Sequence, residues 1–504
     1  MAKGRHSVIM TMLRALPVLL TLFIVGPITA VSAETYYVAV DGSDRNPGTL
    51  EAPWASIHQA NHRVKPGDVV KVKAGVYRQN IVIDDCRGTA QQPVVFEAAG
   101  GTVTIDGSCT ISNWRAETGN CYSAEVGKKA IYQLWSGDRF LLGPRYLSYP
   151  SAFAKAVTPT KDTLQRGQCL LENGRLYVRL FDGGDPNQVT MRGSTSHSLL
   201  LKGVDYTVWR GIGTAWGLNG YKLEAGSAHN LVTDAELQRH EHGILEVGKA
   251  DIVCHDNTFQ RLNIHDIGLS KFEHGIYIGG LRTQVLNCRL HHISGAAIHA
   301  YPNPSHGRYE GNVISDPLPA YYPQHFTGKD LTEPTTYYTA IICWGPGEHQ
   351  VTNNLVVGPF SLGISVHGND NRLVNNTIVL RDGVGVLLVS ERGNTLLNNI
   401  IQTAGLYVSG DTPTDLDYNG YWGGKGWTLG TANYLTLGEV RKVGLEAHGL
   451  VADPRFVDRT KGNLHLSPAS PMRRVGTPLA APPADLLGVA RPQQSPVDLG
   501  AYEE

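Results

Sequence analysis

The chain has 504 residues, of which 41% are hydrophobic and 18% are charged, with a formal net charge of −1. That length exceeds one ordinary compact core, so we expect several domains or one repeat architecture. The charge balance disfavours a nucleic-acid partner, and the 57 glycines favour β structure with many turns.

Residues 1–33 are typical of an export signal. Three basic residues precede an apolar run over 16–28, and Val31, Ser32 and Ala33 form a small-residue cleavage pattern. The run is short and is broken by prolines, which favours cleavage over membrane anchoring. We expect a secreted or periplasmic protein cut near Ala33, whose mature chain does not insert into a membrane.

Residues 34–107 predict short alternating strands separated by Gly, Pro and Asp turns, such as Val69–Val72 after Pro66-Gly67. Ser56 to Val64 is the one segment here that could form a small helix, capping the end of a stack. This opening resembles the N-terminal motif of secreted right-handed parallel β-helix proteins, the pectin-lyase-like superfamily. The resemblance implies a first domain of cap and early coils.

Residues 108–198 do not show the coil repeat. They contain aromatic residues around Trp114 and Trp135 and a hairpin-like piece at 173–187. We expect an inserted antiparallel β subdomain against the side of the stack, in which aromatic residues serve core packing or a sugar cleft. Of the seven cysteines, Cys109 and Cys121 are the best placed to close a loop with a disulfide if the chain is exported.

From residue 199 to about 410 a period of 22 to 24 residues indicates stacked coils. One marker is a turn phrase that ends in Asn, at positions 257, 312, 354, 376 and 399, where stacked amides can form a ladder. A second marker is a small residue followed by an apolar one, at positions 243, 275, 297, 340, 363 and 385. The longer intervals 263–273 and 316–338 predict loops thrown out of the stack.

The C-terminal segment 411–504 continues the pattern of short strands and turns. Phrases such as Asp453-Pro454-Arg455-Phe456 resemble the final coils of the same superfamily. The prediction is therefore an all-β right-handed parallel β-helix, a solenoid, that carries one inserted antiparallel subdomain. Each coil buries its apolar side against its neighbours about 4.8 Å away, and crossover chirality gives the right hand.

Alternation along the repeated strands predicts which side chains face outward together. With the Ile after each small residue pointing inward, one outward column reads Lys222, Leu245, Tyr277, His299, Ile342 and Ser365. The column two residues further contains Tyr301, Trp344 and His367, and the residues before the Gly positions include His242 and His274. We predict a catalytic patch of Tyr277, His299 and His274.

These residue types suit an acidic polysaccharide. Tyr301 and Trp344 offer flat platforms for sugar rings, and a tyrosine or histidine can remove the proton beside a uronate carboxylate. A nearby cation offsets the growing charge, so Lys222, Lys271 and Arg289 join His242, Tyr301, Trp344 and His367 as predicted substrate-binding residues, with Lys249 as a further cation. No cofactor is required; a metal-assisted version would use Asp251, Asp256 and Asp266 to hold Ca²⁺.

The leading hypothesis is a secreted, monomeric polysaccharide lyase that cleaves a uronate polymer by β-elimination. The resemblance also covers glycoside hydrolases and uronate epimerases. A hydrolase needs two carboxylic acids roughly 5 to 10 Å apart, and the candidates are Glu241, Glu246, Asp266 and Glu273. A surface polysaccharide-binding protein is the non-enzymatic alternative.

Overall fold

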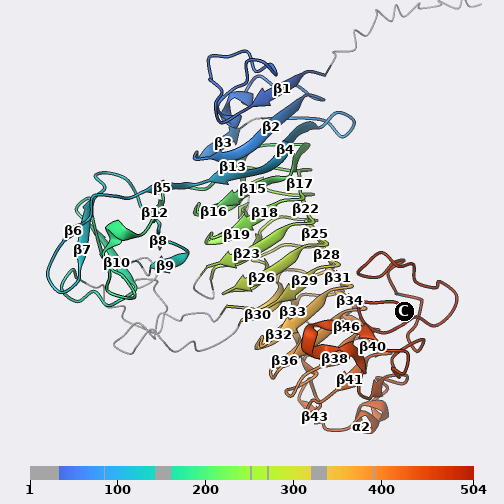
Figure 1. Cartoon of the computed structure of the whole chain (residues 1–504). Coiled ribbons are helices and arrows are strands. Elements are labelled where there is room, and N and C mark those ends of the chain that lie inside the picture. The colour runs from blue at the N-terminus through green and yellow to red at the C-terminus, as the bar shows by residue number, and fades with distance from the viewer. Residues whose placement is uncertain are drawn as a thin grey trace, which may run out of the picture.

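The computed structural model describes residues 33–84, 86–141, 143, 160–249, 252–268, 272–318, 338–389 and 392–504. Its main body is a stack of coils that forms two long sheets of 12 and 22 strands (Figure 1). Coil-to-coil pairing is parallel throughout, as between β16 and β19 or β28 and β31. The prediction of a parallel β-helix is confirmed.

The 12-stranded sheet contributes one strand to each coil. Its strands are β3 (Ile81–Asp84), β13 (Leu199–Lys202), β16 (Asn219–Glu224), β19 (His242–Glu246), β24 (Ile276–Ile278), β27 (Ile298–Ala300), β30 (Thr339–Cys343), β33 (Leu362–His367), β36 (Val384–Val389), β39 (Val408–Gly410), β42 (Trp427–Leu429) and the antiparallel edge β43 (Ala432–Tyr434).

The 22-stranded sheet contributes two strands to each coil, bent at a residue with positive φ such as Asp234 or Asn375. Its first half holds β1 (Thr35–Val38), β14 (Thr207–Arg210), β17 (Leu231–Thr233), β22 (Thr258–Gln260), β25 (Gln284–Leu286), β28 (Arg308–Glu310), β31 (Gln350–Thr352), β34 (Arg372–Val374), β37 (Thr395–Leu397) and β40 (Asp415–Asp417). Its second half holds β15 (Ile212–Ala215), β18 (Glu236–Gln238), β23 (Asn263–Ile267), β26 (Arg289–Ile293), β29 (Val313–Ser315), β32 (Leu355–Gly358), β35 (Thr377–Leu380), β38 (Ile400–Gln402), β41 (Gly420–Trp422) and β44 (Leu450–Val451), while β2 (Val69–Tyr77) and the long β4 (Val94–Asp106) lie at the N-terminal end.

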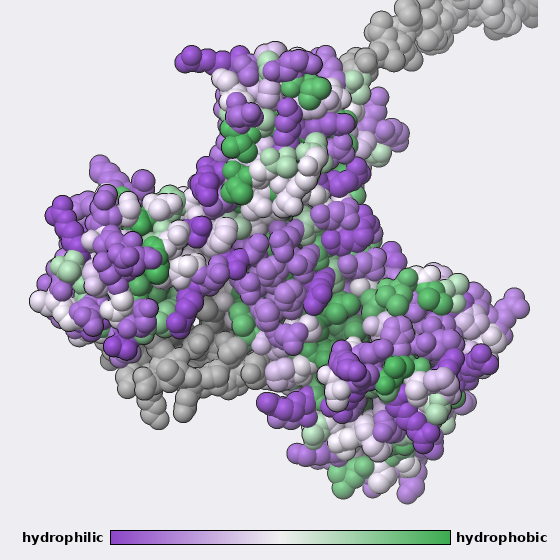
Figure 2. All heavy atoms as spheres, viewed as in Figure 1, coloured by the Kyte–Doolittle hydropathy of each residue, from purple (hydrophilic) through white to green (hydrophobic). Residues whose placement is uncertain are grey.

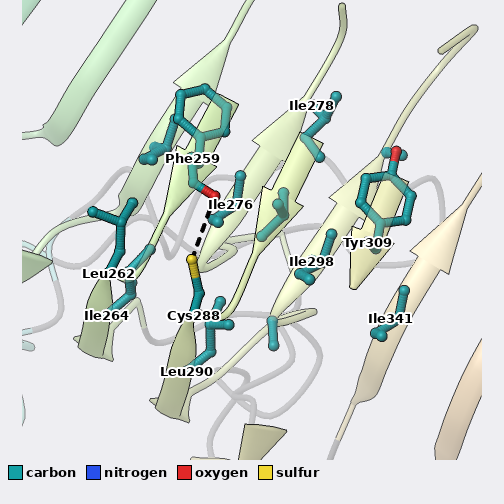
Figure 3. Close-up of a cluster of buried hydrophobic side chains, with 14 of the residues drawn as sticks. Phe259, Leu262, Ile264, Ile276, Ile278, Cys288, Leu290, Ile298, Tyr309 and Ile341 are labelled. Carbon is teal, nitrogen blue, oxygen red and sulfur yellow. Dashed lines mark hydrogen bonds between the residues drawn. The ribbon is translucent and has the colours of Figure 1, made fainter. Parts of the chain in front are cut away.

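The core is a continuous column of aliphatic and aromatic side chains inside the coils. Ile276, Ile298 and Ile341 lie in register on consecutive strands and are fully buried. Figure 3 shows them facing Phe259 and Tyr309 from the opposite sheet. Burial of apolar surface stabilises a fold by about 25 cal/mol per Å². A single coil cannot bury its apolar side, so the coils are stable only when they are stacked.

Asparagine amides hydrogen-bond from coil to coil at two different turns of the stack. In one ladder Asn312, Asn354, Asn376, Asn399 and Asn419 are linked by side-chain hydrogen bonds of 3.0 Å. The predicted fifth member, Asn257, is not in it: Asn257 lies before β22, on the turn that follows the 12-stranded sheet, and bonds to Asn230 at 3.0 Å. Asp256-Asn257 and Gly311-Asn312 are similar phrases at different turns, so the prediction that Asn257 belongs to this ladder is wrong.

The described residues between 108 and 194 form two four-stranded antiparallel sheets with a core of their own. One holds β6 (Arg115–Ala116), β7 (Tyr122–Glu125), β10 (Gln168–Glu172) and β11 (Arg175–Arg179), and the other holds β5 (Ser108–Thr110), β8 (Gln133–Ser136), β9 (Arg139–Leu141) and β12 (Met191–Ser194). This inserted subdomain projects from the side of the stack where β16 and β19 begin (Figure 1). The predicted Cys109–Cys121 disulfide is wrong, since both thiols are free and Cys121 packs with Leu164 and Leu170.

The C-terminal segment turns back over the lower coils. After helix α2 (Leu437–Lys442), the hairpin β45 (Phe456–Asp458) and β46 (Asn463–Leu466) packs its Leu464 with Leu355 and Val379 of the 22-stranded sheet. Hydrophilic side chains cover the coils above it, over β18, β23 and β26 (Figure 2). The described part of the chain contains no helix of the length and hydropathy needed to cross a bilayer.

The remaining short elements correct two local predictions. The helix expected over 56–64 is one 3-10 turn, η1 (Ile57–Ala60), with η2 (Pro186–Gln188) and η4 (Arg459–Lys461) elsewhere. Residues 263–267, expected in a loop, form β23, so the departure from the stack begins only after Ile267. A small hairpin, β20 (Gly248–Lys249) with β21 (Ile252–Val253), leaves the coil near residue 250. Of the other predicted loop, residues 319–337 lie outside the described residues.

Candidate active site

The outward column predicted from alternation is present in register on the 12-stranded sheet. Lys222 pairs with Leu245, Leu245 with Tyr277, Tyr277 with His299, and His299 with Ile342. Each member therefore lies about 4.8 Å from the next. Tyr277 and His299 are the two aromatic members, and their rings lie 5.3 Å apart, edge to face.

Two further histidines join them from the turn that enters the sheet. The phrase His-Gly-Ile recurs because the chain passes the next coil closely there: a Cβ on Gly275 would lie 2.5 Å from the carbonyl oxygen of Ala297. The residue before each Gly therefore sits at a fixed place, and the rings of His242 and His274 stack with centroids 5.6 Å apart. Both are buried, with exposed fractions of 8% and 2%. We call His242, His274, Tyr277 and His299 the histidine–tyrosine cluster.

Hydrogen bonds fix the protonation pattern of the cluster. The Ala296 N–H donates to His274 Nδ1 at 3.0 Å, so that nitrogen carries no hydrogen. A neutral His274 must then carry its hydrogen on Nε2, which lies 2.8 Å from His299 Nδ1. His299 Nδ1 is therefore an acceptor, and the hydrogen of His299 is on Nε2. His299 offers a ligand a hydrogen-bond donor rather than a lone pair.

The same pattern keeps His299 uncharged. An imidazolium there would point a second hydrogen at His274 Nε2, which already bears one. Burial lowers the pKa of His299 to about 4, with a smaller contribution from His367. Burial likewise lowers the pKa of His274 well below its ordinary value. His274 and His299 are therefore neutral at physiological pH.

The depressed pKa gives a direct prediction. Because the charged form is disfavoured, we expect His299 to remain neutral down to about pH 5 and to gain a proton only near pH 4. NMR titration of the imidazole resonances checks this, with the His299 signals assigned by their loss in a His299→Asn variant. A midpoint near the ordinary histidine value of about 6.5 would contradict the hydrogen-bond pattern.

An aromatic strip continues from the cluster along the neighbouring column. Tyr301, Trp344 and His367 succeed one another on three coils, with Tyr301 and Trp344 centroids 5.3 Å apart and the Trp344 and His367 rings stacked at 4.2 Å. Tyr301 and Trp344 are 38% and 40% exposed. Such faces offer apolar platforms to the flat sides of sugar rings.

The two predicted cations whose side chains the structure describes, Lys222 and Arg289, do not lie beside Tyr277 and His299. Lys222 lies in the column, two coils from Tyr277, but its Nζ is 2.8 Å from Glu224 Oε2. Arg289 is on β26, in the second half of the other sheet. Lys271 lies outside the described residues. His242, Tyr301, Trp344 and His367 are the predicted binding residues that the fold does bring beside Tyr277 and His299.

The two predicted calcium carboxylates that the structure describes, Asp256 and Asp266, are not brought together either. Asp256 lies on the turn after the 12-stranded sheet, where Arg282 holds the pKa of its carboxyl at about 2. Asp266 belongs to β23 and bonds to His265 at 2.9 Å. Asp251 is outside the described residues. A shared Ca²⁺ between Asp256 and Asp266 is therefore not supported.

The hydrolase candidates separate into two groups. Glu246 points into the coil interior, where Asn257, Thr283 and the Gly280 N–H all donate to it, and burial raises its pKa to about 7. Glu241 and Glu273 precede His242 and His274 on consecutive coils and are 8% and 3% exposed. Only these last two carboxylates border the histidine–tyrosine cluster.

Sequence reasoning missed the Ala296 backbone N–H, which sets the tautomer of His274 and through it that of His299. No side-chain pattern marks a backbone donor. Its only trace in the sequence is that Ala296-Ala297 takes the place of His-Gly on that coil.

Comparison with known proteins agrees with this architecture. Residues 243–419 match a family described as right handed beta helix region. Pectate lyase PEL9 of Emericella nidulans is 41% identical over 81 residues, a match that spans 16% of this chain and 20% of that protein. Among solved structures, XylC in complex with xylose superposes with a TM-score of 0.56 and pectate lyase Pel9A with 0.51, each at 13% identity, over 93% and 94% of this chain and 98% of theirs.

These likenesses define the class of the protein by its fold. The chain is a right-handed parallel β-helix. More narrowly, it has the pectin-lyase-like form of that fold, which its solved neighbours share over nearly their whole length. At this identity the superpositions establish architecture alone, and activity has to be argued from the site.

Proposed function

We propose that the protein is an exported polysaccharide lyase that cleaves a uronate-containing polymer by β-elimination. The observation that carries the proposal is the histidine–tyrosine cluster bordered by the aromatic strip, on one face of the 12-stranded sheet. Export with cleavage near Ala33 and a monomeric state are part of the proposal. Polysaccharide substrates lie outside the cell, which is consistent with the N-terminal pattern.

The reaction assigns a separate task to each ring. Tyr277, as its phenolate, takes the proton from the carbon beside the uronate carboxylate. His299 donates its Nε2 hydrogen to that carboxylate as negative charge grows on it. The bond to the glycosidic oxygen breaks, a carbon–carbon double bond forms, and Tyr277 returns the proton to the departing oxygen.

In this mechanism, neutral hydrogen-bond donors rather than a cation stabilise the charge that grows on the substrate carboxylate. Within the described residues of the column, the neighbours of Tyr277 and His299 are the apolar Leu245 and Ile342. His274 serves as a positioning residue, because its hydrogen bond holds the donor tautomer of His299. Tyr301 and Trp344 place the sugar rings.

The local similarity to a pectate lyase supports a lyase over other activities of the fold. A glycoside hydrolase is the second candidate, because Glu241 and Glu273 form a pair of buried carboxyls beside the cluster. A uronate epimerase would use the same proton abstraction without breaking the chain, and a binding protein would use only the aromatic strip.

One assay separates these possibilities. The purified protein is incubated with a panel of uronate and neutral glycans, and products are read by ultraviolet absorbance and mass spectrometry. We expect absorbing oligosaccharides from a uronate polymer, each lighter by one water than the hydrolysis product. Reducing ends without absorbance would select the hydrolase, an altered sugar NMR spectrum at constant chain length the epimerase, and binding without change the adhesive alternative.

A further inference from the structure

A second cluster of chemistry-bearing side chains lies at the opposite edge of the 12-stranded sheet, on the turns that lead to the 22-stranded sheet. Tyr206, His229, Asp256 and Arg282 occupy the same turn position on consecutive coils, each with φ between 51° and 55°. The shared left-handed conformation turns these side chains outward in one row. His255 stands beside the row, preceding Asp256 in the chain.

Three of these side chains converge on one point. His229 and His255 each offer a ring nitrogen and Asp256 a carboxylate oxygen, and the three atoms lie within 4.8 Å of one another. His229 Nε2 is 3.7 Å from Asp256 Oδ2, which is too long for a hydrogen bond. Two ligands held about 2.1 Å from a common ion at an angle of roughly 120° have this separation.

The partners of His229 and Asp256 are those that metal ligands use. Asp205 Oδ1 is 2.9 Å from His229 Nδ1, so that nitrogen holds the ring hydrogen and Nε2 presents its lone pair to Asp256. Tyr206 stacks on the His229 ring at 4.2 Å and fixes its plane. Arg282 binds both oxygens of Asp256, at 2.8 and 2.6 Å, and orients the carboxylate.

The charge balance also favours a cation. Asp205 and Asp256 bring two negative charges into direct contact with the imidazoles, and Arg282 compensates one of them. In the ion-free arrangement His255 Nδ1 bonds to Asp256 Oδ2 at 2.7 Å, and a bound ion would take the place of that hydrogen. Nitrogen ligands with one oxygen suit Zn²⁺ and its neighbours in the first transition row rather than Ca²⁺.

We propose that His229, His255 and Asp256 form a site for a divalent transition-metal ion, with Zn²⁺ as the fitting occupant and water as its fourth ligand. His229 belongs to one coil and the other two ligands to the next. The ion therefore joins adjacent coils and stabilises the turn. The site is separate from the histidine–tyrosine cluster and does not depend on the proposed lyase activity.

The test uses the full mature chain without an affinity tag, freed of metal by a chelator. Zn²⁺ is titrated calorimetrically, and Co²⁺ is added as a spectroscopic probe. We expect one equivalent to bind, with the visible absorption of a four-coordinate Co²⁺ site and a rise in the unfolding temperature. His229→Ala and His255→Ala should each abolish binding, and Asp205→Asn should weaken it by about 10- to 100-fold.

Two controls guard against adventitious binding by other histidines. His306 is the next residue of the same row and contacts Glu348. The His306→Ala variant should still bind one equivalent of metal. A His265→Ala/His291→Ala variant removes the stacked imidazoles on β23 and β26 and should also still bind one equivalent of metal. Wild-type protein that binds no Zn²⁺ or Co²⁺, or a folded His229→Ala/His255→Ala variant that still binds one equivalent, overturns the proposal.

Discussion

Tyr277→Phe is expected to lower the rate of unsaturated-product formation by about 10²- to 10⁴-fold, the usual contribution of a positioned acid or base. The change removes one oxygen atom and leaves a ring of the same shape in the outward column beside His299. The fold should therefore be unaffected, as circular dichroism and unfolding temperature would verify. Initial rates at saturating substrate isolate the chemical step from binding.

Tyr206→Phe is the matched control. It makes the same chemical change at a ring that stacks on His229, at the other edge of the sheet, and should retain full activity. If Tyr277→Phe kept wild-type turnover, the proton acceptor would have to be another group, and the assignment of roles above would be wrong.

The donor role of His299 can be separated from a base role within the same assay. An amide side chain keeps an N–H donor but has no basic lone pair near neutral pH. If His299 acts through its Nε2 hydrogen, His299→Gln should retain more activity than His299→Ala. Equal loss in both variants would favour a base. A His274→Ala variant, which frees the His299 tautomer, should acquire a new pH dependence rather than only a lower rate.

Much of this architecture is readable from the sequence because a stacked coil repeats one constraint. The small residue and the Ile that follows it recur at the starts of β19, β24, β27, β30 and β33, so alternation alone places Tyr277 beside His299 and Tyr301 beside Trp344. The same alternation, counted from Ile244, puts Glu246 inside the coil. Glu246 therefore does not reach the surface that a hydrolase carboxylate has to line.

Other features have no signature in a single chain. Asn257 and Asn312 stand in similar phrases, yet they lie on different bends of the coil, since Asn257 precedes β22 and Asn312 precedes β29. Arg289 and His299 are close in sequence, but they belong to different sheets, and only the strand register separates them. The tautomer of His299 depends on a backbone donor from Ala296. These outcomes require the path of the chain as well as its period.

The asparagine ladder leads to the largest expected effect on stability. The side chain of Asn376 receives two hydrogen bonds from Asn354, through its backbone N–H and its amide, each at 3.0 Å. It donates to the Val351 carbonyl at 2.8 Å and to Asn399 Oδ1 at 3.0 Å. All of these groups are buried, so no bulk solvent replaces a lost partner.

We expect Asn376→Ala to lower the free energy of unfolding by about 3 to 5 kcal/mol, because it orphans two buried donors and a buried carbonyl at about 1 to 3 kcal/mol each. The midpoint of denaturant unfolding measures the change. Asn433→Ala, at an exposed residue of β43 whose side chain accepts a hydrogen bond from Thr428, should alter it by no more than about 0.5 kcal/mol. A loss below about 1 kcal/mol for Asn376→Ala would mean that the amides do not hold adjacent coils together, since an unmade buried hydrogen bond alone costs that much.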